Sequence, residues 1–267
     1  MAIFGTRDRP GLDLAQTSGQ RNPHHCISPE KRRLLAFSKR FQFVMSDDKS
    51  GARVLIPAGP VSLEGMLHVP VAAAGVVIFS HGSGSGRLSP RNRYVAAQLR
   101  AAGLGTLLLD LLTEDEDRDY QMRFDIDLLT QRLEYAVRFV RNDAATEAAQ
   151  VGLFGASTGA ASALRVAAAM PDSVRAVVSR GGRPDLTGTG ALGQVRAPTL
   201  LIVGGLDTDV IELNRSAQTR LVNCKSELHI VPGASHLFEE RGTLEEVARL
   251  SGEWFVHYLS PTAGASD

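Results

Sequence analysis

The sequence predicts an α/β fold, built on a mostly parallel, doubly wound sheet with an antiparallel edge. Short apolar runs of strand length recur along the chain and alternate with longer segments whose apolar residues have helical spacing. This alternation is typical of a parallel sheet that is covered by helices on both faces. A weaker period-two alternation over residues 61–69 comes before the apolar runs and indicates a strand with one exposed side.

The expected elements follow one another from residue 53 to residue 259. Residues 53–57 and 61–69 are expected to form two strands of a meander, which supplies the antiparallel edge. The wholly apolar run at 75–80 is typical of a central strand that is buried on both faces. The segment 126–141 has apolar side chains at a helical period. The other expected strands are 104–109, 150–154, 174–179, 198–203 and 226–231, and the other expected helices are 90–102, 157–169, 209–221 and 244–259.

The composition is that of an ordinary globular protein, because 43% of the 267 residues are hydrophobic and 22% are charged. The 29 basic and 29 acidic side chains leave no net charge, so neither nucleic acid nor an anionic membrane is an expected partner. The sequence shows no apolar segment of signal-peptide type. It also shows no apolar segment of about 20 residues, the length that spans a bilayer. A cytoplasmic protein is therefore expected. Cys26 and Cys224 lack the spacing of a metal or redox pair and are interpreted as free thiols.

Residues 1–45 differ from the rest of the chain. They contain the basic run 31–33 and show little apolar periodicity outside 34–43. We expect an N-terminal arm that is either mobile or in contact with another copy in a homo-oligomer. The adjacent His24 and His25 have no further ligands nearby in the sequence, so no metal site is expected there. Residues 46–262 are expected to form a single α/β domain.

The most informative motif is Gly155-Ala156-Ser157-Thr158-Gly159, a G-x-S-x-G sequence between an apolar strand and an Ala-rich helix. That context is the one in which this motif forms a sharp strand-to-helix turn. The turn strains the serine backbone, and glycines are needed where side chains would collide with neighbouring elements. It raises the serine hydroxyl above the sheet edge and aims the Thr158 N–H at a developing oxyanion. The flanking strand and helix argue against a glycine-rich turn with an incidental serine.

A serine hydroxyl needs a general base, and that base needs a carboxylate to orient it. Asp207 and His236 each follow a predicted strand, and they come in the order serine, acid, histidine that this kind of site uses. We therefore predict Ser157 as the nucleophile, His236 as the base and Asp207 as the orienting acid. Asp209 is close enough to be a rival and is interpreted as the cap of the next helix.

The glycine-rich loop at 81–87 follows the central strand 75–80. We predict that the backbone N–H of Ser83 is the second oxyanion donor and that His81 holds the loop in place. A phosphate-binding loop is the alternative interpretation. The segment lacks the third glycine of a dinucleotide fingerprint and the lysine of a P-loop, so no nucleotide cofactor is expected.

Arg87 and Arg180 are candidates for binding an anionic group of the substrate, because both lie beyond predicted strand ends. The alternative, which the sequence favours, is that they pair with Asp110, Asp185 or the acidic cluster 114–117. This cluster follows a predicted strand end and is expected to form a solvated loop. The short link between the strand that ends at 179 and the strand that begins at 198 leaves no room for a large lid domain. We therefore expect an open cleft and small substrates.

Beyond these single motifs, longer stretches of the chain resemble a known family. From about residue 75 to residue 259 it resembles the dienelactone-hydrolase-like members of the α/β-hydrolase superfamily, and it is similar to small hydrolase domains found alone or fused to phosphoribosyltransferases. The matching stretches are HGSGSGRLSPRNR, LLLDLLTEDE, GLFGASTGAA, VVSRGGRPDL, LLIVGGLD and VPGASHLFEE. The resemblance implies the α/β-hydrolase fold and a catalytic triad. Dienelactone hydrolases use a cysteine nucleophile, whereas this chain has Ser157, which favours esterase-like activity.

The sequence thus predicts a serine hydrolase that cleaves small carboxylic esters through an acyl-enzyme, as short-chain carboxylesterases do. The expected partner is a small-molecule ester, and no metal or organic cofactor is implied. Two alternatives stay open. One is a hydrolase-fold module without turnover that binds or assembles with another enzyme. The other is hydrolysis of a lactone, an amide or a C–C bond by the same residues.

Overall fold

A computed structural model describes residues 51–188 and 190–260 of the chain. The predictions on the N-terminal arm at 1–45, on His24 and His25 and on Cys26 lie outside the described residues.

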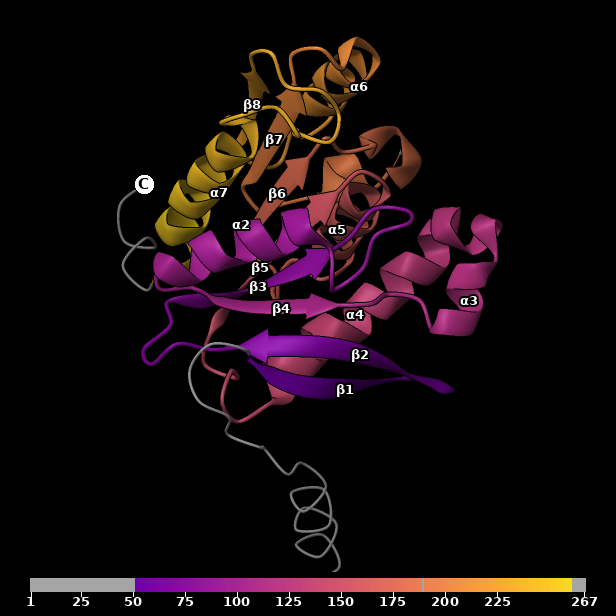
Figure 1. The fold of residues 1–267 in the computed structure, drawn as a ribbon, viewed down its shortest axis with the longest axis vertical. Coiled ribbons are helices and arrows are strands. Elements are labelled where there is room, and N and C mark those ends of the chain that lie inside the picture. The colour runs from indigo at the N-terminus through magenta and orange to yellow at the C-terminus, as the bar shows by residue number, and fades with distance from the viewer. Residues whose placement is uncertain (1–50, 189, 261–267) are drawn as a thin grey trace, which may run out of the picture. The chain divides into compact units, whose positions relative to one another are not determined.

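The described residues form a sheet of eight strands in the order β1-β2-β4-β3-β5-β6-β7-β8 (Figure 1). Strand β2 runs antiparallel to both of its neighbours, β1 and β4, and every pairing from β4 to β8 is parallel. The predicted doubly wound, mostly parallel sheet with an antiparallel edge is therefore confirmed. The strands are β1 (Ala52–Ala58), β2 (Val61–His68), β3 (Gly75–Ser80), β4 (Gly105–Leu109), β5 (Gln150–Ala156), β6 (Ala176–Arg180), β7 (Thr199–Gly204) and β8 (Ser226–Val231).

Helices cover both faces of the sheet. On one face lie α2 (Pro90–Ala101) and α7 (Thr243–Leu259), which pack against each other and against the central strands (Figure 1). On the other face lie α4 (Ile126–Asn142), α5 (Thr158–Ala169) and α6 (Thr208–Gln218). Strands β3 and β7 are buried along their whole length and β5 is buried beyond Gln150, because both faces of the sheet are covered here. The apolar run at 75–80 predicted this burial for β3.

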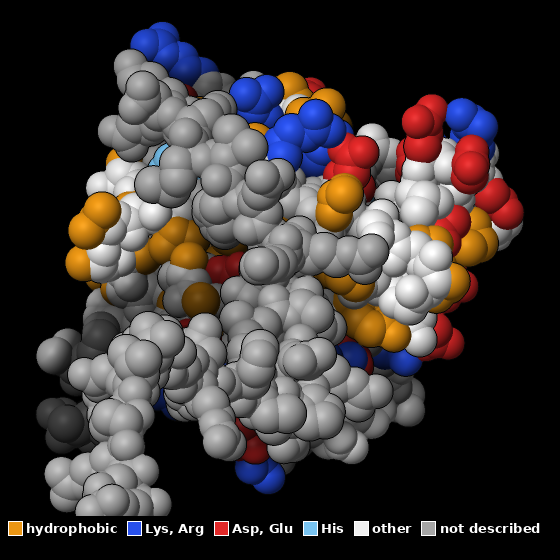
Figure 2. Space-filling model, turned by 90° about the horizontal axis from the view of Figure 1, so that it is seen from below, with side chains coloured by type: hydrophobic (Ala, Val, Ile, Leu, Met, Phe, Trp, Pro, Cys, Tyr) orange, Lys and Arg blue, Asp and Glu red, His pale blue; other side chains and the backbone are white. Residues whose placement is uncertain are grey.

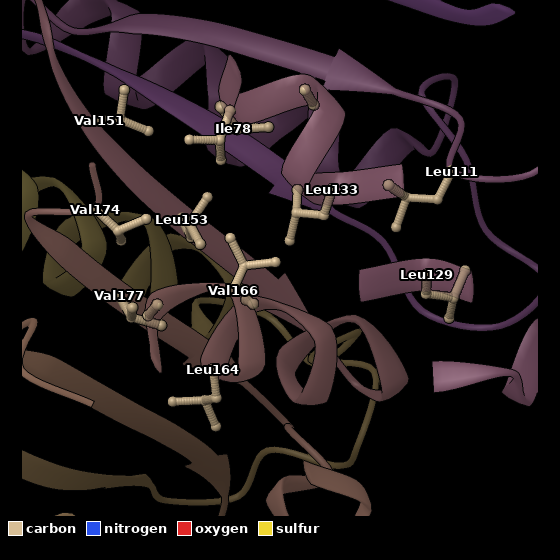
Figure 3. Packing of buried hydrophobic residues seen from close by; sticks show 14 of the residues in the cluster. Ile78, Leu111, Leu129, Leu133, Val151, Leu153, Leu164, Val166, Val174 and Val177 are labelled. Carbon is tan, nitrogen blue, oxygen red and sulfur yellow. The ribbon is translucent and has the colours of Figure 1, made fainter. Parts of the chain in front are cut away.

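The larger core lies between the sheet and helices α4 and α5. Figure 3 shows Ile78, Leu153 and Val177 of three adjacent strands beside Leu133 of α4 and Val166 of α5, all without solvent exposure. Full burial of each such side chain contributes about 1.5–3 kcal/mol to stability. Because α5 is rich in alanine, it packs closely on β5 and fixes the turn between them.

The acidic cluster at 114–117 does not form the solvated loop that its charges predicted. It forms a short helix, α3 (Glu114–Arg118), which begins with a capping box. The Thr113 hydroxyl accepts the Glu116 N–H at 3.2 Å, and the Glu116 carboxylate accepts the Thr113 N–H at 2.8 Å. Glu114 and Asp115 are exposed, whereas Glu116 and Asp117 are partly buried and form ion pairs with arginines outside α3. Figure 2 shows acidic side chains gathered on the side of the molecule where α3 lies.

Three short 3₁₀ turns complete the described part of the chain, namely η1 (Tyr120–Phe124), η2 (Pro184–Thr187) and η3 (Leu192–Gln194). Two of them lie between β6 and β7, where the described residues contain no other helix or strand. A large lid domain is thus absent from this link, as predicted. Helix α6 ends at Gln218, three residues before the expected end at 221. Within residues 51–188 and 190–260, no helix combines the length and the apolar character needed to cross a membrane.

Candidate active site

Ser157 lies in a strained turn between β5 and α5. Its φ of 50° and ψ of −120° place a non-glycine residue in a region that side chains rarely adopt. Strain of this kind costs about 1–3 kcal/mol and persists only where neighbours hold it. Here the Ser157 N–H donates to the carbonyl of Arg180, and the Ser157 carbonyl accepts the Arg183 N–H, each at 3.1 Å. The loop after β6 therefore holds the turn.

The two glycines of the motif are required by space. A Cβ on Gly155 would lie 2.4 Å from the Cα of Ala160, and one on Gly159 would lie 2.1 Å from the carbonyl oxygen of Ser80. Two buried serines strengthen this junction, with the Ser80 and Ser162 hydroxyl oxygens 2.7 Å apart and the Ser162 hydroxyl donating to the Gly159 carbonyl. The predicted role of the glycines is confirmed, and the serine pair is a support that the sequence did not reveal.

The three residues predicted as nucleophile, base and acid form a hydrogen-bonded chain. His236 Nδ1 lies 2.6 Å from Oδ2 of Asp207, and His236 Nε2 lies 3.3 Å from Oγ of Ser157. Donation from Nδ1–H to the carboxylate leaves Nε2 as the acceptor for the serine proton. The Asp207 side chain is 16% exposed and the His236 side chain 37% exposed, so the acid is shielded while the base reaches solvent.

The loops that carry Asp207 and His236 are joined by backbone hydrogen bonds. The N–H groups of Gly205 and Leu206 donate to the carbonyls of Val231 and Ala234 at 2.8 and 2.9 Å. A Cβ on Gly204 would lie 2.4 Å from the Ala234 carbonyl oxygen, so this close approach needs glycine. The acid and the base are therefore positioned as one unit.

The loop after β8 has its own supports around the histidine. The Glu240 carboxylate accepts the Ser235 N–H at 3.0 Å, and this hydrogen bond lowers the pKa of Glu240. Phe238 is buried with a φ of 57°, which anchors the loop in the core at the cost of backbone strain. Neither residue was singled out from the sequence, because both act through contacts that the fold creates.

Asp209 does not compete with Asp207 for His236. It is exposed in the first turn of α6, which begins at Thr208. Its predicted capping role is wrong, because Asp207 itself occupies the N-cap position. The Asp207 side chain makes no capping hydrogen bond and instead binds His236. A favoured capping residue has thus given up its usual partner for the histidine.

The loop after β3 rests against the nucleophile. A Cβ on Gly82 would lie 3.0 Å from the Cβ of Ser157, so a side chain there would push against the nucleophile. The Ser83 N–H donates to Oγ1 of Thr158 at 3.0 Å. The two residues predicted as oxyanion donors are therefore in direct contact with each other.

His81 holds this loop to the strand beside it, as the sequence predicted. Its Nε2 accepts the Leu111 N–H and its Nδ1–H donates to the Gly82 carbonyl, each at 3.1 Å. These bonds need the neutral ring, since a protonated Nε2 has no lone pair for Leu111. Burial is the main cause that lowers the pKa of His81 below its usual value.

The loop after β6 also has a buried support that the sequence did not suggest. Asn214 of α6 is fully buried and donates from Nδ2 to the Gly182 carbonyl at 3.0 Å. The preceding Gly181 has a φ of 51°, and a Cβ there would lie 3.5 Å from the His236 ring. This segment thus touches both the base and the backbone of the nucleophile.

The candidate substrate-binding arginines differ in their surroundings. The Arg87 guanidinium is paired with Glu64 and Asp110, and the Arg87 N–H also donates to Asp110 at 2.6 Å. The pair with Asp110 is one that the sequence offered as the alternative, whereas the pair with Glu64 was not expected. Arg180 is 7% exposed, and its Nε and Nη1 have no hydrogen-bond partner. Burial, with a smaller effect of Arg91, lowers the pKa of Arg180 to about 10.

No group of three or more potential metal ligands occurs within the described residues.

With this geometry established, the chain can be compared with known proteins. A model of the dienelactone hydrolase family matches residues 63–254. The chain belongs to the dienelactone hydrolase family. A crystal structure of a dienelactone hydrolase from Anabaena variabilis is 53% identical, with a TM-score of 0.75, and the match covers 77% of this chain and 96% of that one. Est1E from Butyrivibrio proteoclasticus is 16% identical over 78% of this chain and 98% of that chain, with a TM-score of 0.66, and shows the fold alone.

A curated relative from Mycobacterium tuberculosis is named as a phosphoribosyl transferase. It is 54% identical over 206 residues, which is 77% of this chain and 46% of the relative. The chain thus spans about half the length of the curated relative. Membership of the dienelactone hydrolase family agrees with the α/β-hydrolase fold of the described residues.

Proposed function

We propose that this chain is a serine hydrolase that cleaves small carboxylic esters through an acyl-enzyme. The observation that carries the proposal is the chain of hydrogen bonds from Asp207 through His236 to Ser157, with the serine on a strained turn. A serine hydroxyl becomes a useful nucleophile near neutral pH only beside such an oriented base.

In the proposed reaction, the Ser157 oxygen attacks the ester carbonyl carbon while His236 Nε2 accepts the hydroxyl proton. The N–H groups of Ser83 and Thr158 stabilise the negative charge on the carbonyl oxygen. His236 then protonates the leaving alcohol as its C–O bond breaks, which leaves the acyl group on Ser157. A water molecule, deprotonated by His236, attacks the acyl group and releases the carboxylic acid.

The serine rather than a cysteine is the proposed nucleophile. Within the described residues the chain has a single cysteine, Cys224, whose thiol points to the Leu221 carbonyl near the end of α6. Burial raises the pKa of this thiol, which works against the reactive thiolate. Cys224 therefore has neither the position nor the charge state of a nucleophile.

The surroundings of Arg180 favour substrates that carry an anionic group. Burying a guanidinium without acceptors is unfavourable, and a carboxylate from a ligand would satisfy the free Nε and Nη1 groups. The Ser157 N–H donates to the Arg180 carbonyl at 3.1 Å, so the backbone of Arg180 lies directly beside the nucleophile. Arg87 is not proposed for this role, because Glu64 and Asp110 already occupy its guanidinium.

The proposal is tested by assaying p-nitrophenyl esters from acetate to decanoate with wild type and Ser157→Ala. We expect turnover of short chains by the wild type and none above background by the variant. Activity that survives in Ser157→Ala would exclude Ser157 as the nucleophile. A folded wild type without turnover that is labelled by a fluorophosphonate probe would direct the search to lactones, amides or C–C bonds. A wild type that is not labelled would favour the binding-module alternative.

A further inference from the structure

The peptide group between Gly82 and Ser83 is held from both sides. Its carbonyl accepts hydrogen bonds from His81 Nδ1–H and from the Ser85 N–H, each at 3.1 Å. Its N–H donates to Oγ1 of Thr158 at 3.0 Å. Because the peptide group is planar, these contacts together fix the direction of the N–H.

We infer that the Thr158 hydroxyl is a positioning group of the oxyanion hole, which holds the Ser83 N–H beside Ser157. This inference rests on the proposed function. It gives Thr158 two separate tasks, since its backbone N–H is proposed to bind the oxyanion while its side chain orients the second donor.

The Ser83 N–H needs a restraint of its own, because Ser83 lies between two glycines. Ser83 and Gly84 are exposed, and the glycines on either side of Ser83 allow the backbone wide freedom. Gly84 adopts a φ of 69°, which other residues rarely adopt. An oxyanion donor accelerates a reaction only if it is already aimed when charge develops. A fixed acceptor near the nucleophile supplies that aim.

Thr158 is suited to orienting the Ser83 N–H because its own position is fixed by burial and by the helix. It is 2% exposed and forms the first residue of α5, next to the strained Ser157. A hydroxyl oxygen is a neutral acceptor and therefore weaker than an oxyanion. The Ser83 N–H is accordingly held in the resting site and is available to the carbonyl oxygen once negative charge forms there.

The test compares Thr158→Val with Thr158→Ser. Valine has the shape of threonine but cannot accept the Ser83 N–H, whereas serine keeps the hydroxyl, and the backbone N–H remains in both variants. Alanine is unsuitable, because a cavity of about 10 Å³ already lies beside Thr158 and a water molecule in the enlarged space could replace the lost oxygen.

With p-nitrophenyl acetate, we expect Thr158→Val to lower kcat about tenfold with KM within about twofold of wild type. The loss is smaller than the roughly 10²–10³-fold effect of deleting a donor, because the N–H is misaimed rather than removed. Thr158→Ser, which keeps the hydroxyl, should recover most of the kcat that Thr158→Val loses. Phenylboronic acid, to which the Ser157 oxygen adds to form a tetrahedral boronate, should bind Thr158→Val weaker by the same factor as kcat/KM falls. Thermal melting checks that both variants fold.

Wild-type kcat in Thr158→Val, a rise in kcat, or an equal loss in Thr158→Ser would overturn the inference. A fluorophosphonate probe separates its failure from that of the proposed function. In labelling, the serine oxygen bonds to phosphorus, fluoride leaves and His236 takes the proton, so the same donors are used without an ester. A labelled wild type with an equally fast Thr158→Val overturns the inference alone. A wild type that neither turns over esters nor is labelled overturns both.

Discussion

Replacing Asp207 with Asn should almost abolish turnover while the equivalent change two residues away should not. Asp207 lies 2.6 Å from His236 Nδ1 and is 16% exposed, so water cannot easily take its place. An asparagine that turns its NH₂ group to Nδ1 moves the ring proton to Nε2, which then cannot accept the Ser157 proton. One that presents its oxygen keeps the tautomer but loses the negative charge that stabilises the protonated ring.

The expected loss in kcat is about 10⁴-fold, which corresponds to about 5.5 kcal/mol of transition-state stabilisation. Asp209→Asn is a matched control, because Asp209 is exposed in the first turn of α6 and has no part in the hydrogen-bonded chain. A surface change of this kind alters stability by about 0.5 kcal/mol or less and should leave kcat within about twofold.

The assay is the initial rate of p-nitrophenyl butyrate hydrolysis at saturating ester, with circular dichroism to confirm folding. The fluorophosphonate probe should still label Ser157 in Asp207→Asn, but more slowly than in wild type, since the nucleophile itself is unchanged. If Asp209→Asn lost as much kcat as Asp207→Asn, or if Asp207→Asn kept more than about a tenth of it, the assignment of the acid would be refuted.

Three further changes test other parts of the site. Gly159→Ala should destabilise the protein by about 3 kcal/mol in urea unfolding, because its Cβ would lie 2.1 Å from a backbone oxygen. Gly193→Ala, whose Cβ would lie 3.9 Å from the Arg220 carbonyl oxygen, should be neutral or stabilising. Burial lowers the pKa of His81, so the stability that the neutral ring contributes is present above about pH 6.5 and is lost as pH falls below that value. His81→Gln should therefore show a smaller drop in unfolding free energy between about pH 8 and about pH 5.5 than wild type. An equal drop would contradict the assignment of His81 as a buried neutral support. Arg180→Met should raise KM for a p-nitrophenyl hemisuccinate about tenfold or more and leave the neutral butyrate unchanged, whereas equal effects on both esters would remove the proposed anion contact.

The local features of the site could be predicted from the sequence because each depends on neighbouring residues. The motif around Ser157 contains the glycines that its own turn requires, and the strand before it and the helix after it are continuous in the chain. Asp207 and His236 could be assigned because parallel strands bring their carboxyl ends to one edge of the sheet. The triad geometry thus follows from local patterns combined with one rule of topology.

The supports of the site could not be predicted, because they join residues that are far apart in the chain. The bond between Ser83 and Thr158 spans 75 residues, and the support of the Gly182 carbonyl by Asn214 spans 32. Arg87 and Arg180 looked alike in sequence. Only the fold shows that Arg87 lies between two carboxylates and that Arg180 is buried without one.

The short helix α3 shows a different limit. Four consecutive acids predicted a solvated loop, since like charges repel one another. The capping box between Thr113 and Glu116 and the favourable position of acids at a helix N-terminus outweigh that repulsion. The sequence contains this cap as a threonine followed three residues later by a glutamate, and here the cap decides the structure.

The central claim is that hydrolysis passes through an ester on Ser157. Its most direct test is to quench the protein with acid during turnover of p-nitrophenyl acetate and to map the modified peptide by mass spectrometry. We expect an acetyl group on the peptide that contains Ser157, absent in Ser157→Ala, together with loss of turnover in that variant. Continued turnover with no adduct on Ser157, or with the acetyl group on Cys224, would contradict the account.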